Sequence, residues 1–566
     1  MSMKFSQMPY ERPGIEKVAA EGAMLAAAVK SAKNATEVME QYEKFKKLYE
    51  NQDTLLTLVF IRHSLDTRDE FYDRENDFFD EVSPLLAKVA IDFYREMVNS
   101  PYRSELVCKL GELWFTDAEL KLKGFDDRII EEMQQENALC SKYDKLLASA
   151  RLDFDGKKLN LSQLRAYQLS ADRAVRKAAF AKRTEFFTDN EAELDEIFDE
   201  LVKLRHAMAR KLGYESFVEL GYIRMKRNCY DAAMVERFRN QVKRVLVPFV
   251  AGLHEQRRNM LGVDALKFYD EDIFYADGNP TPKGSPKEMF GAGKKMYDEL
   301  SAETKEFFEY MLENELFDVL AKEGKSGGGY CATIADYGSP FIFANFNGTS
   351  EDVDVMTHEC GHALCSYCAR DIEIMEYREY TYDIAEIHSM AMEFFTADWM
   401  RLFFKEDTEK FLYMQLASAL AFIPYGCMVD EFQHIVYENP DMSPAERKVA
   451  WMKLEAEYKP HLDYDGDPFF GKGGMWQRQT HIYESPFYYI DYCFAQTCAV
   501  QYRLWMESNR TAAWSSYIDL LKKAGTRTLT DVVAEAGLKS PFESGCMETI
   551  VSGADELLKR LGENFS

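Results

Sequence analysis

Helical periodicity dominates the first half of this chain. Across residues 14–258 apolar side chains recur at three- and four-residue steps, as in Val38, Tyr42, Phe45 and Tyr49, with charged residues between them. This spacing places the apolar side chains on one face of an amphipathic helix. No repeat of about 30 to 45 residues is visible, which argues against a helical solenoid. The sequence therefore predicts a mainly α body.

Turn-forming residues interrupt this pattern mostly in the second half. Residues 277–286, 324–329 and 463–475 are rich in Gly, Pro, Asp and Asn and are predicted to be loops. The second of them precedes residues 340–347, which alternate in polarity and are rich in aromatic and β-branched side chains. This segment predicts a strand, and hence one small sheet in a helical protein.

Charge and cysteine usage restrict the partners. The 566 residues include 96 acidic and 69 basic side chains, which gives a formal net charge of −27. Such a chain repels phosphate backbones and anionic membrane surfaces, so neither nucleic acid nor a membrane is an expected partner. The longest apolar runs, such as residues 55–61, are much shorter than the roughly 18 residues of a membrane span. The 11 scattered cysteines and the polar N-terminus indicate reduced thiols in a cytoplasmic protein, and the oligomeric state stays open.

The motif His358-Glu359-Cys360-Gly361-His362 carries the clearest chemistry. On a helix, positions i and i+4 share a face, so both imidazoles can bind one Zn²⁺ while Glu359 holds the attacking water. Thr349 and Asp352 predict a capping-box start for that helix. The alternative is a surface helix that carries two histidines by chance.

A catalytic zinc ion needs a third protein ligand. Glu386 and Glu393 are seven residues apart in a second helical pattern, and Ser389 lies one turn beyond Glu386. Glu386 could complete the site, with Glu393 orienting a ligand imidazole. The alternatives are a solvated acidic face, His388 pointing about 200° away from Glu386 on the same helix, and Cys365 as a ligand.

A cluster of aromatic residues follows at residues 481–492, which include His481, Tyr488, Tyr489 and Tyr492. Phenol or imidazole donors fixed near a peptide carbonyl would stabilise the negative charge that grows on its oxygen during hydrolysis. The alternative is a stripe of aromatic side chains that only pack.

Taken together, these motifs resemble the thimet-oligopeptidase-like zinc metallopeptidases, in the branch of oligoendopeptidase F and Pz-peptidase. The resemblance rests on the HExxH motif with a glutamate 24 residues after its second histidine, in a Glu-x-x-Ser-x-x-x-Glu setting. It extends to residues 481–492 and to the Gly-rich loop before residues 340–347. It covers roughly residues 173–566.

The resemblance implies a fold. It is a mainly α, large two-lobed helical body with a deep substrate channel and a small β-sheet next to the HExxH helix, as in zincins. Residues 1–172 would form an N-terminal helical lobe, and residues 173–566 the zinc metallopeptidase region.

The resemblance also implies roles for single residues. One zinc ion per chain would be bound by His358, His362 and Glu386, with Glu359 as general base. Ser389 and Glu393 would support the ligands, and the donors to the oxyanion would be His481, Tyr489 and Tyr492. The strand at Ala344–Asn347 would be the edge to which an extended peptide adds, with substrate contacts from Ala344, Asn345, Asn347 and Tyr488.

The sequence thus predicts a zinc-dependent oligoendopeptidase that hydrolyses internal bonds of short peptides. Two alternatives stay open: a zinc exopeptidase of the same fold, similar to a dipeptidyl carboxypeptidase, and a non-catalytic helical scaffold that binds peptides. The loops that close the channel would decide between cleavage at internal bonds and at chain ends.

Overall fold

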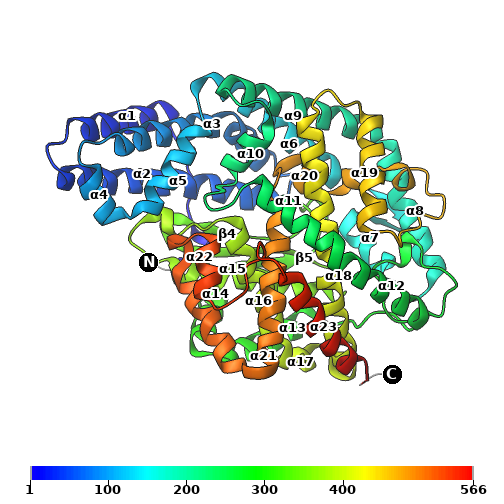
Figure 1. The fold of residues 1–566 in the computed structure, drawn as a ribbon. Coiled ribbons are helices and arrows are strands. Elements are labelled where there is room, and N and C mark those ends of the chain that lie inside the picture. Colours follow the sequence, from blue (N-terminus) through cyan, green and yellow to red (C-terminus); the bar gives the residue numbers. More distant parts are fainter. Residues whose placement is uncertain (1–2, 564–566) are drawn as a thin grey trace.

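The computed structural model describes residues 3–563 and is predominantly helical (Figure 1). The terminal residues 1–2 and 564–566 of the two predicted regions lie outside it. The first part of the chain forms α1 (Ile15–Ser31), α2 (Ala35–Leu65), α3 (Glu70–Val98), α4 (Arg103–Leu110), α5 (Glu112–Lys123), α6 (Ile130–Ala148), β1 (Leu152–Phe154), β2 (Lys157–Leu159), α7 (Leu161–Gln168), α8 (Arg173–Asp189), α9 (Glu191–Leu212), α10 (Phe217–Arg224), α11 (Ala232–Gln241) and α12 (Val247–Leu261).

The second part contains the remaining sheet and the longest core helices. It forms α13 (Pro286–Leu300), α14 (Ala302–Glu313), β3 (Phe317–Leu320), β4 (Tyr330–Ile334), β5 (Ser339–Phe346), α15 (Glu351–Ala369), α16 (Tyr382–Phe395), α17 (Met400–Phe404), α18 (Thr408–Glu438), α19 (Pro444–Tyr458), α20 (Thr480–Glu484), α21 (Tyr489–Lys523), α22 (Leu529–Glu535) and α23 (Cys546–Glu563). The predicted loops at 277–286 and 324–329 carry no helix or strand before Pro286.

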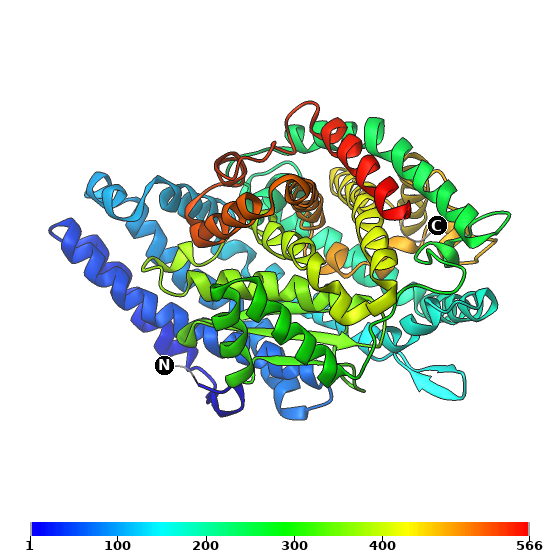
Figure 2. The same ribbon diagram turned by 90° about the horizontal axis from the view of Figure 1, so that it is seen from below.

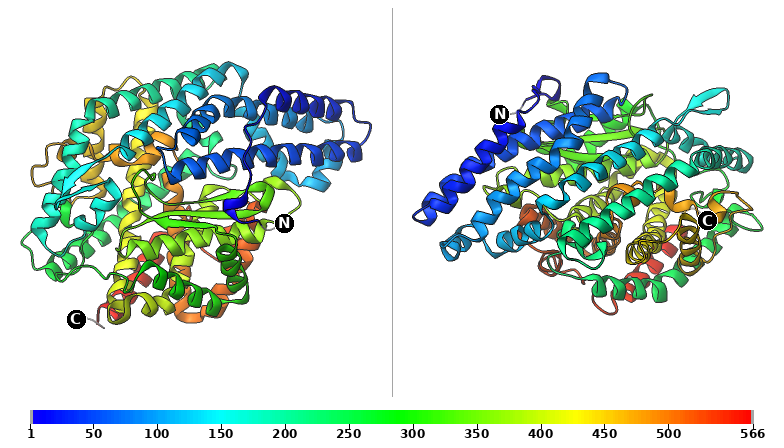
Figure 3. Two further views of the ribbon diagram at one scale, coloured as in Figure 1. Left: turned by 180° about the vertical axis from the view of Figure 1, so that it is seen from behind. Right: turned by 90° about the horizontal axis from the view of Figure 1, so that it is seen from above.

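Helices α1–α5 form a group that projects on one side in Figure 3, and they share a hydrophobic cluster with Met375 and Tyr377. The side chain of Asn34 caps α2 by accepting a hydrogen bond from the Glu37 amide at 2.9 Å. The apolar face of α2, including Tyr42 and Phe45, is buried in this core. The helix that the amphipathic pattern predicts is therefore present in the structure.

The predicted division at residues 172 and 173 does not coincide with a break between cores. Side chains of α6 and α7, such as Tyr143 and Leu164, belong to the same large cluster as those of α15 and α21. A short antiparallel hairpin, β1–β2, also interrupts the helices at this point, and the helical pattern gave no sign of it. The two-region division stays a prediction.

The small sheet has the strand order β3-β5-β4. Strand β5 is parallel to β3 and antiparallel to β4, with Tyr330 opposite Phe343. Helices α13 and α14 cover one side, where Phe290 of α13 packs on Phe317 and Phe346 of the strands (Figure 2). Helix α15 contacts β4 and β5, so the sheet lies next to the HExxH helix.

The start of α15 differs from the predicted capping box. The residue before the helix is Ser350, and its side chain makes no capping bond. The Asp352 carboxylate instead accepts hydrogen bonds from the amides of Asn347 and Gly348, both at 2.8 Å. It thereby ties the end of β5 to the first turn of α15.

Helix α16 crosses α15 at very short range because of Gly361. A Cβ atom at this position would lie 2.5 Å from the carbonyl oxygen of His388 and 2.6 Å from the Cα of Ser389. Only a residue without a side chain permits this approach of the two backbones. The glycine inside the HExxH motif therefore sets the distance between the two helices.

One helical stretch of the described chain, Tyr382–Glu438, is long and apolar enough to cross a membrane by length and composition. Of its most apolar window, 67% is buried inside the fold, which is typical of core helices.

The glycine contact yields a prediction for stability. Gly361→Ala should lower the free energy of unfolding by about 1–3 kcal/mol, because the added methyl group meets backbone that cannot rotate away. The measurement is the midpoint of urea denaturation followed by circular dichroism. Gly291→Ala is the matched control: it is exposed on α13, and its Cβ would meet nothing within 4 Å. Equal midpoints for the two variants would contradict the steric argument.

Candidate metal centre and active site

Helices α15 and α16 bring two histidines and a glutamate to one point. One ligand atom each of His358, His362 and Glu386 can be chosen so that all lie within 4.8 Å of one another. The Oε2 atom of Glu386 is 3.2 Å from Nε2 of His358 and 3.4 Å from Nε2 of His362. The i, i+4 spacing places both histidines on one face of α15. The close approach of α16 at Gly361 brings the Glu386 carboxylate to them.

Electrostatics favour an ionised carboxylate here. The side chain of Glu386 is 1% exposed, and this burial opposes ionisation. The imidazoles of His362 and His358 outweigh it and hold the pKa of Glu386 well below its usual range. Two nitrogen donors and an anionic oxygen that converge in this way fit a divalent cation.

Neighbouring side chains fix the orientation of these groups. The Nδ1 atom of His358 lies 2.7 Å from Oε1 of Glu393, which leaves Nε2 directed at Glu386. Burial disfavours a charged His358, but the carboxylates of Glu386 and Glu393 raise its pKa well above the ordinary value. Ser389 donates to Oε2 of Glu386 at 2.9 Å, and the Tyr488 hydroxyl donates to Oε1.

Glu359 faces the same space from α15. It is buried, and its Oε2 atom has no hydrogen-bond partner among the described residues. Burial raises its pKa, while the two histidines act against that rise. A buried carboxylate oxygen without a partner beside a convergent ligand set indicates a place for a ligand or water. The donor set and this atom together fit the predicted metal centre.

The two rival ligands lie outside this group. His388 is fully buried, and burial lowers its pKa to about 3. Its Nε2 atom lies 3.8 Å from Sγ of Cys365, so the two side chains pack against each other. A second set of possible ligands, formed by His254, Glu271 and His461, already contains a cation, because Lys459 Nζ is 2.6 Å from Glu271.

The aromatic segment supplies hydrogen-bond donors to the same cavity. His481 lies in α20, and burial lowers its pKa to about 4, so its imidazole is neutral. The Tyr425 hydroxyl donates to Oε1 of Gln479, whose Nε2 then donates to Nδ1 of His481 at 2.9 Å. The proton of His481 is therefore on Nε2, which lies 3.1 Å from the Tyr492 hydroxyl.

The three tyrosines differ in position. Tyr488 and Tyr492 line the cavity together with His358, Glu359 and His362. Tyr489 does not line it, and its ring packs against those of Phe422 and Tyr425. Sequence reasoning placed Tyr489 among the donors and Tyr488 among the substrate contacts, whereas in the structure Tyr488 reaches the metal ligands.

The predicted substrate strand needs a correction. Strand β5 is the central strand of its sheet, so Ala344, Asn345 and Asn347 do not form an edge. The Asn345 side chain is directed at the carbonyls of Ser326 and Gly328, and the Ala344 carbonyl accepts from Lys325. The outer strand beside the site is β4. The sequence does contain a hairpin pattern here, because residues 330–334 and 339–346 flank a short turn. The first segment is only five residues long, so its strand pattern is weak.

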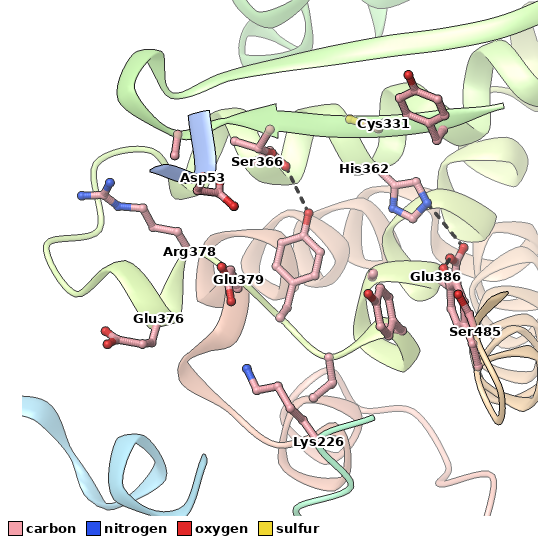
Figure 4. Close-up of a pocket in the computed structure, with 18 of the residues that line it drawn as sticks. Asp53, Lys226, Cys331, His362, Ser366, Glu376, Arg378, Glu379, Glu386 and Ser485 are labelled. Carbon is pink, nitrogen blue, oxygen red and sulfur yellow. Dashed lines mark hydrogen bonds and ion pairs between the residues drawn. The ribbon is translucent and has the colours of Figure 1, made fainter. Parts of the chain in front are cut away.

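The cavity holds about 790 Å³, which is in the range of ligand sites. Figure 4 shows Cys331 on the strand side, with His362 and Glu386 at one end and Asp53, Glu376 and Arg378 at the other. Helices α2, α3, α5 and α10 complete the lining with Tyr49, Asp53, Tyr94, Lys121 and Arg224.

A buried ion cluster holds the aromatic segment in place. Arg227, between α10 and α11, pairs with Asp491 of α21 and lies 3.7 Å from Asp383 of α16. It also donates to the Phe487 carbonyl at 2.7 Å, immediately before Tyr488. Sequence reasoning missed this residue, because a single arginine in a loop carries no motif.

Two histidines and a glutamate on one helix, completed by a carboxylate from a second helix at a substrate-sized cavity, are the arrangement of a metallopeptidase. Residues 5–125 match the peptidase M3 N-terminal domain, and residues 166–283 and 294–552 match peptidase family M3. The chain belongs to peptidase family M3.

Relatives agree with this membership. The chain is 24% identical to an oligoendopeptidase F homolog of Borreliella burgdorferi over 89% of this chain and 90% of the relative. It is 23% identical to oligopeptidase PepF of Bacillus subtilis over 94% and 83%. The structure of Pz peptidase A with inhibitor 2 superimposes with a TM-score of 0.98 at 48% identity, covering 99% of this chain and all of that one. The family resemblance and the mainly α fold expected from the sequence are confirmed.

The ion cluster yields a prediction. Arg227→Met should lower the free energy of unfolding by about 3–5 kcal/mol, because two buried carboxylates lose their cation. The midpoint of urea denaturation measures this loss. Lys559→Met is the control: it removes an exposed partner of Asp555 and should change stability by no more than about 0.5 kcal/mol. Similar midpoints for both variants would show that the cluster is not a structural clamp.

Proposed function

We propose that this protein is a zinc-dependent oligoendopeptidase that hydrolyses internal bonds of short peptides. The observation that carries the proposal is the convergence of His358, His362 and Glu386 beside the unpaired oxygen of Glu359. The names of the relatives, oligoendopeptidase F and oligopeptidase, support the substrate class.

His358, His362 and Glu386 would hold one zinc ion through Nε2, Nε2 and a carboxylate oxygen. Imidazole and carboxylate ligands, three in number with an open position, favour zinc. Zn²⁺ bound there would supply a Lewis acid that makes a water molecule more acidic and polarises a peptide carbonyl.

Glu359 is the proposed general base. It accepts a proton from the attacking water and returns it to the amide nitrogen as the peptide bond breaks. Its raised pKa suits this exchange, because the carboxyl group both takes up and releases the proton readily. The position of its Oε2 atom, buried and without a partner, leaves that atom available.

His481, Tyr488 and Tyr492 are the proposed donors toward substrate oxygen. Each lines the cavity, and the tautomer of His481 presents an Nε2 proton to it. Burial raises the pKa of Tyr488 and Tyr492 well above the usual value, so both hydroxyls keep their protons. Fixed neutral donors of this kind stabilise a developing oxyanion without reorganisation.

The peptide is proposed to bind along β4. This outer strand lines the cavity through Tyr330, Cys331 and Thr333. Gly329 lies just before it, and a Cβ there would be 3.5 Å from Oε1 of Glu359. Main-chain hydrogen bonds to β4 would place a scissile bond next to the base.

The surroundings favour short, unfolded substrates and a reducing compartment. The cavity is enclosed between the N-terminal helices and the catalytic helices, so a folded domain would not reach Glu359.

All 11 cysteines are free thiols, including the buried Cys360 and Cys365. We therefore propose a cytoplasmic location.

The decisive test is cleavage of an internally quenched peptide of about ten residues with both ends blocked, with and without a chelator and with zinc added back. We expect chelator-sensitive cleavage at an internal bond. Glu359→Gln should keep bound zinc, measured by plasma mass spectrometry, and lose about 10²–10⁴-fold in kcat. His362→Ala should lose the zinc itself.

Three results would contradict parts of this proposal. Cleavage only of peptides with free ends would indicate an exopeptidase. No cleavage by protein shown to hold zinc would indicate a peptide-binding scaffold. A Glu359→Gln variant with near wild-type kcat would remove Glu359 as the base.

The tyrosine positions yield a further prediction. Tyr492→Phe should lower kcat about 100-fold, with a much smaller change in KM, because one oxyanion donor is lost. Tyr489→Phe is the matched control, since this hydroxyl lies off the cavity lining, and its kcat should stay near wild type. The opposite ranking of the two kcat values would show that Tyr489 is the donor.

A further inference from the structure

Two arginines that line one cavity have no ion-pair or hydrogen-bond partner in the described part of this acidic chain. Arg183 on α8 and Arg478, just before α20, line a cavity of about 370 Å³. Among residues 3–563 neither guanidinium forms an ion pair or donates a hydrogen bond; Arg183 lies 5.9 Å from the centre of the Phe187 ring and Arg478 5.8 Å from that of Tyr425. Both Nε atoms are buried without a partner. A net charge of −27 makes such unpaired cations unexpected.

The carboxylates of the same cavity are already engaged. Asp272 and Glu351 both pair with Arg165, at 2.7 Å and 2.6 Å. Glu271 pairs with Lys459 at 2.6 Å. Asp354 accepts from Gln415, and burial raises its pKa well above the ordinary value, so it contributes little negative charge. None of these carboxylates therefore forms a direct ion pair with Arg183 or Arg478, although Asp272 lies close enough to act on the pKa of both.

The electrostatic surroundings of the two guanidinium groups differ. Burial opposes the charge of Arg478, but Tyr425 and Asp272 outweigh it and raise the pKa of Arg478. Burial, followed by the charges of Arg478 and Arg165, lowers the pKa of Arg183 to about 9. A buried cation without a counter-charge is costly, and an arginine binds a carboxylate with two parallel hydrogen bonds. An anion bound between the two side chains would relieve this cost. The cavity has the polarity and size of an anion subsite.

This cavity adjoins the active site through the wall that holds His481. The Arg478 guanidinium lies 5.8 Å from the centre of the Tyr425 ring. The Tyr425 hydroxyl bonds to Gln479, which bonds to His481, each at 2.9 Å. Phe422 lines the cavity, and its ring is 6.2 Å from that of Tyr492. The two cavities share no lining residue, so a peptide that reaches both would have to pass the wall at Tyr492 and Phe422.

We propose that Arg183 and Arg478 form a subsite for a carboxylate of the bound peptide, next to the catalytic cavity. The inference rests on the proposed peptidase function and adds a specificity to it. The carboxylate is the free C-terminus of a short peptide, or the side chain of Asp or Glu at the corresponding position. In the first case the position of the subsite fixes how many residues lie between the scissile bond and the C-terminus.

The test uses three unlabelled peptides of one sequence and the full-length zinc-loaded enzyme. The first peptide has a free C-terminus, the second a C-terminal amide, and the third a C-terminal amide with glutamate as its last residue. Cleavage is followed by liquid chromatography and mass spectrometry, and kcat/KM is determined for each peptide. The enzymes are wild type, the double variant Arg183→Gln/Arg478→Gln, and the control Arg237→Gln, which changes an exposed arginine on α11.

For wild type we expect the free-acid peptide to exceed its amide by at least about tenfold in kcat/KM. The double variant should bring this ratio to near one by slowing the free acid only, and Arg237→Gln should leave it unchanged. If the third peptide exceeds the plain amide in wild type and not in the double variant, the acidic side chain is the source of the carboxylate.

Two outcomes would overturn the subsite while leaving the peptidase function intact. They are equal kcat/KM for all three peptides in wild type, and a free-acid preference that persists in a folded double variant. The wild-type comparison needs no substitution, so it decides the matter even if the double variant fails to fold; Arg478→Lys, which keeps the charge, should then retain part of the preference. Cleavage of none of the peptides would overturn both proposals.

Discussion

The close contact of α15 and α16 at Gly361 is the constraint on which the site depends. The HExxH helix by itself provides two imidazoles and a general-base candidate, but no third ligand. The absent side chain at Gly361 lets the backbone at His388 and Ser389 approach to a distance that no other residue would allow. Glu386 then reaches both imidazoles, Ser389 donates a hydrogen bond to Glu386, and Glu393 contacts His358.

Buried charges organise the second half of the site. Arg227 joins the start of α16 to the start of α21 and binds the carbonyl before Tyr488. The aromatic donors are thus tied to the same helix that supplies Glu386. Arg183 and Arg478 contrast with this cluster, because they are only partly buried and form no ion pair.

Much of the catalytic set followed from local spacing. The i, i+4 histidines, the adjacent Glu359 and the seven-residue spacing of Glu386 and Glu393 are properties of single helices, and periodicity predicts them well. Strand β4 was missed and β5 was taken for the edge, because sheet order depends on contacts between distant segments. The orientation of Tyr488 and Tyr489 could not be predicted for a related reason. Adjacent residues at the start of α21 point in different directions, and the packing of Tyr489 against Phe422 and Tyr425 leaves Tyr488 facing the cavity.

The sequence by itself determined the helical class, the family and the residues of the candidate ligand set, since these follow from short-range periodicity and motif chemistry. The tertiary structure decided which strand lies at the edge of the sheet, which tyrosines line the cavity and which arginines form no ion pair. These last features arise from the packing of segments hundreds of residues apart, such as α8 against the turn before α20. No local pattern encodes whether an arginine will meet a carboxylate after folding, because that depends on every element that encloses it.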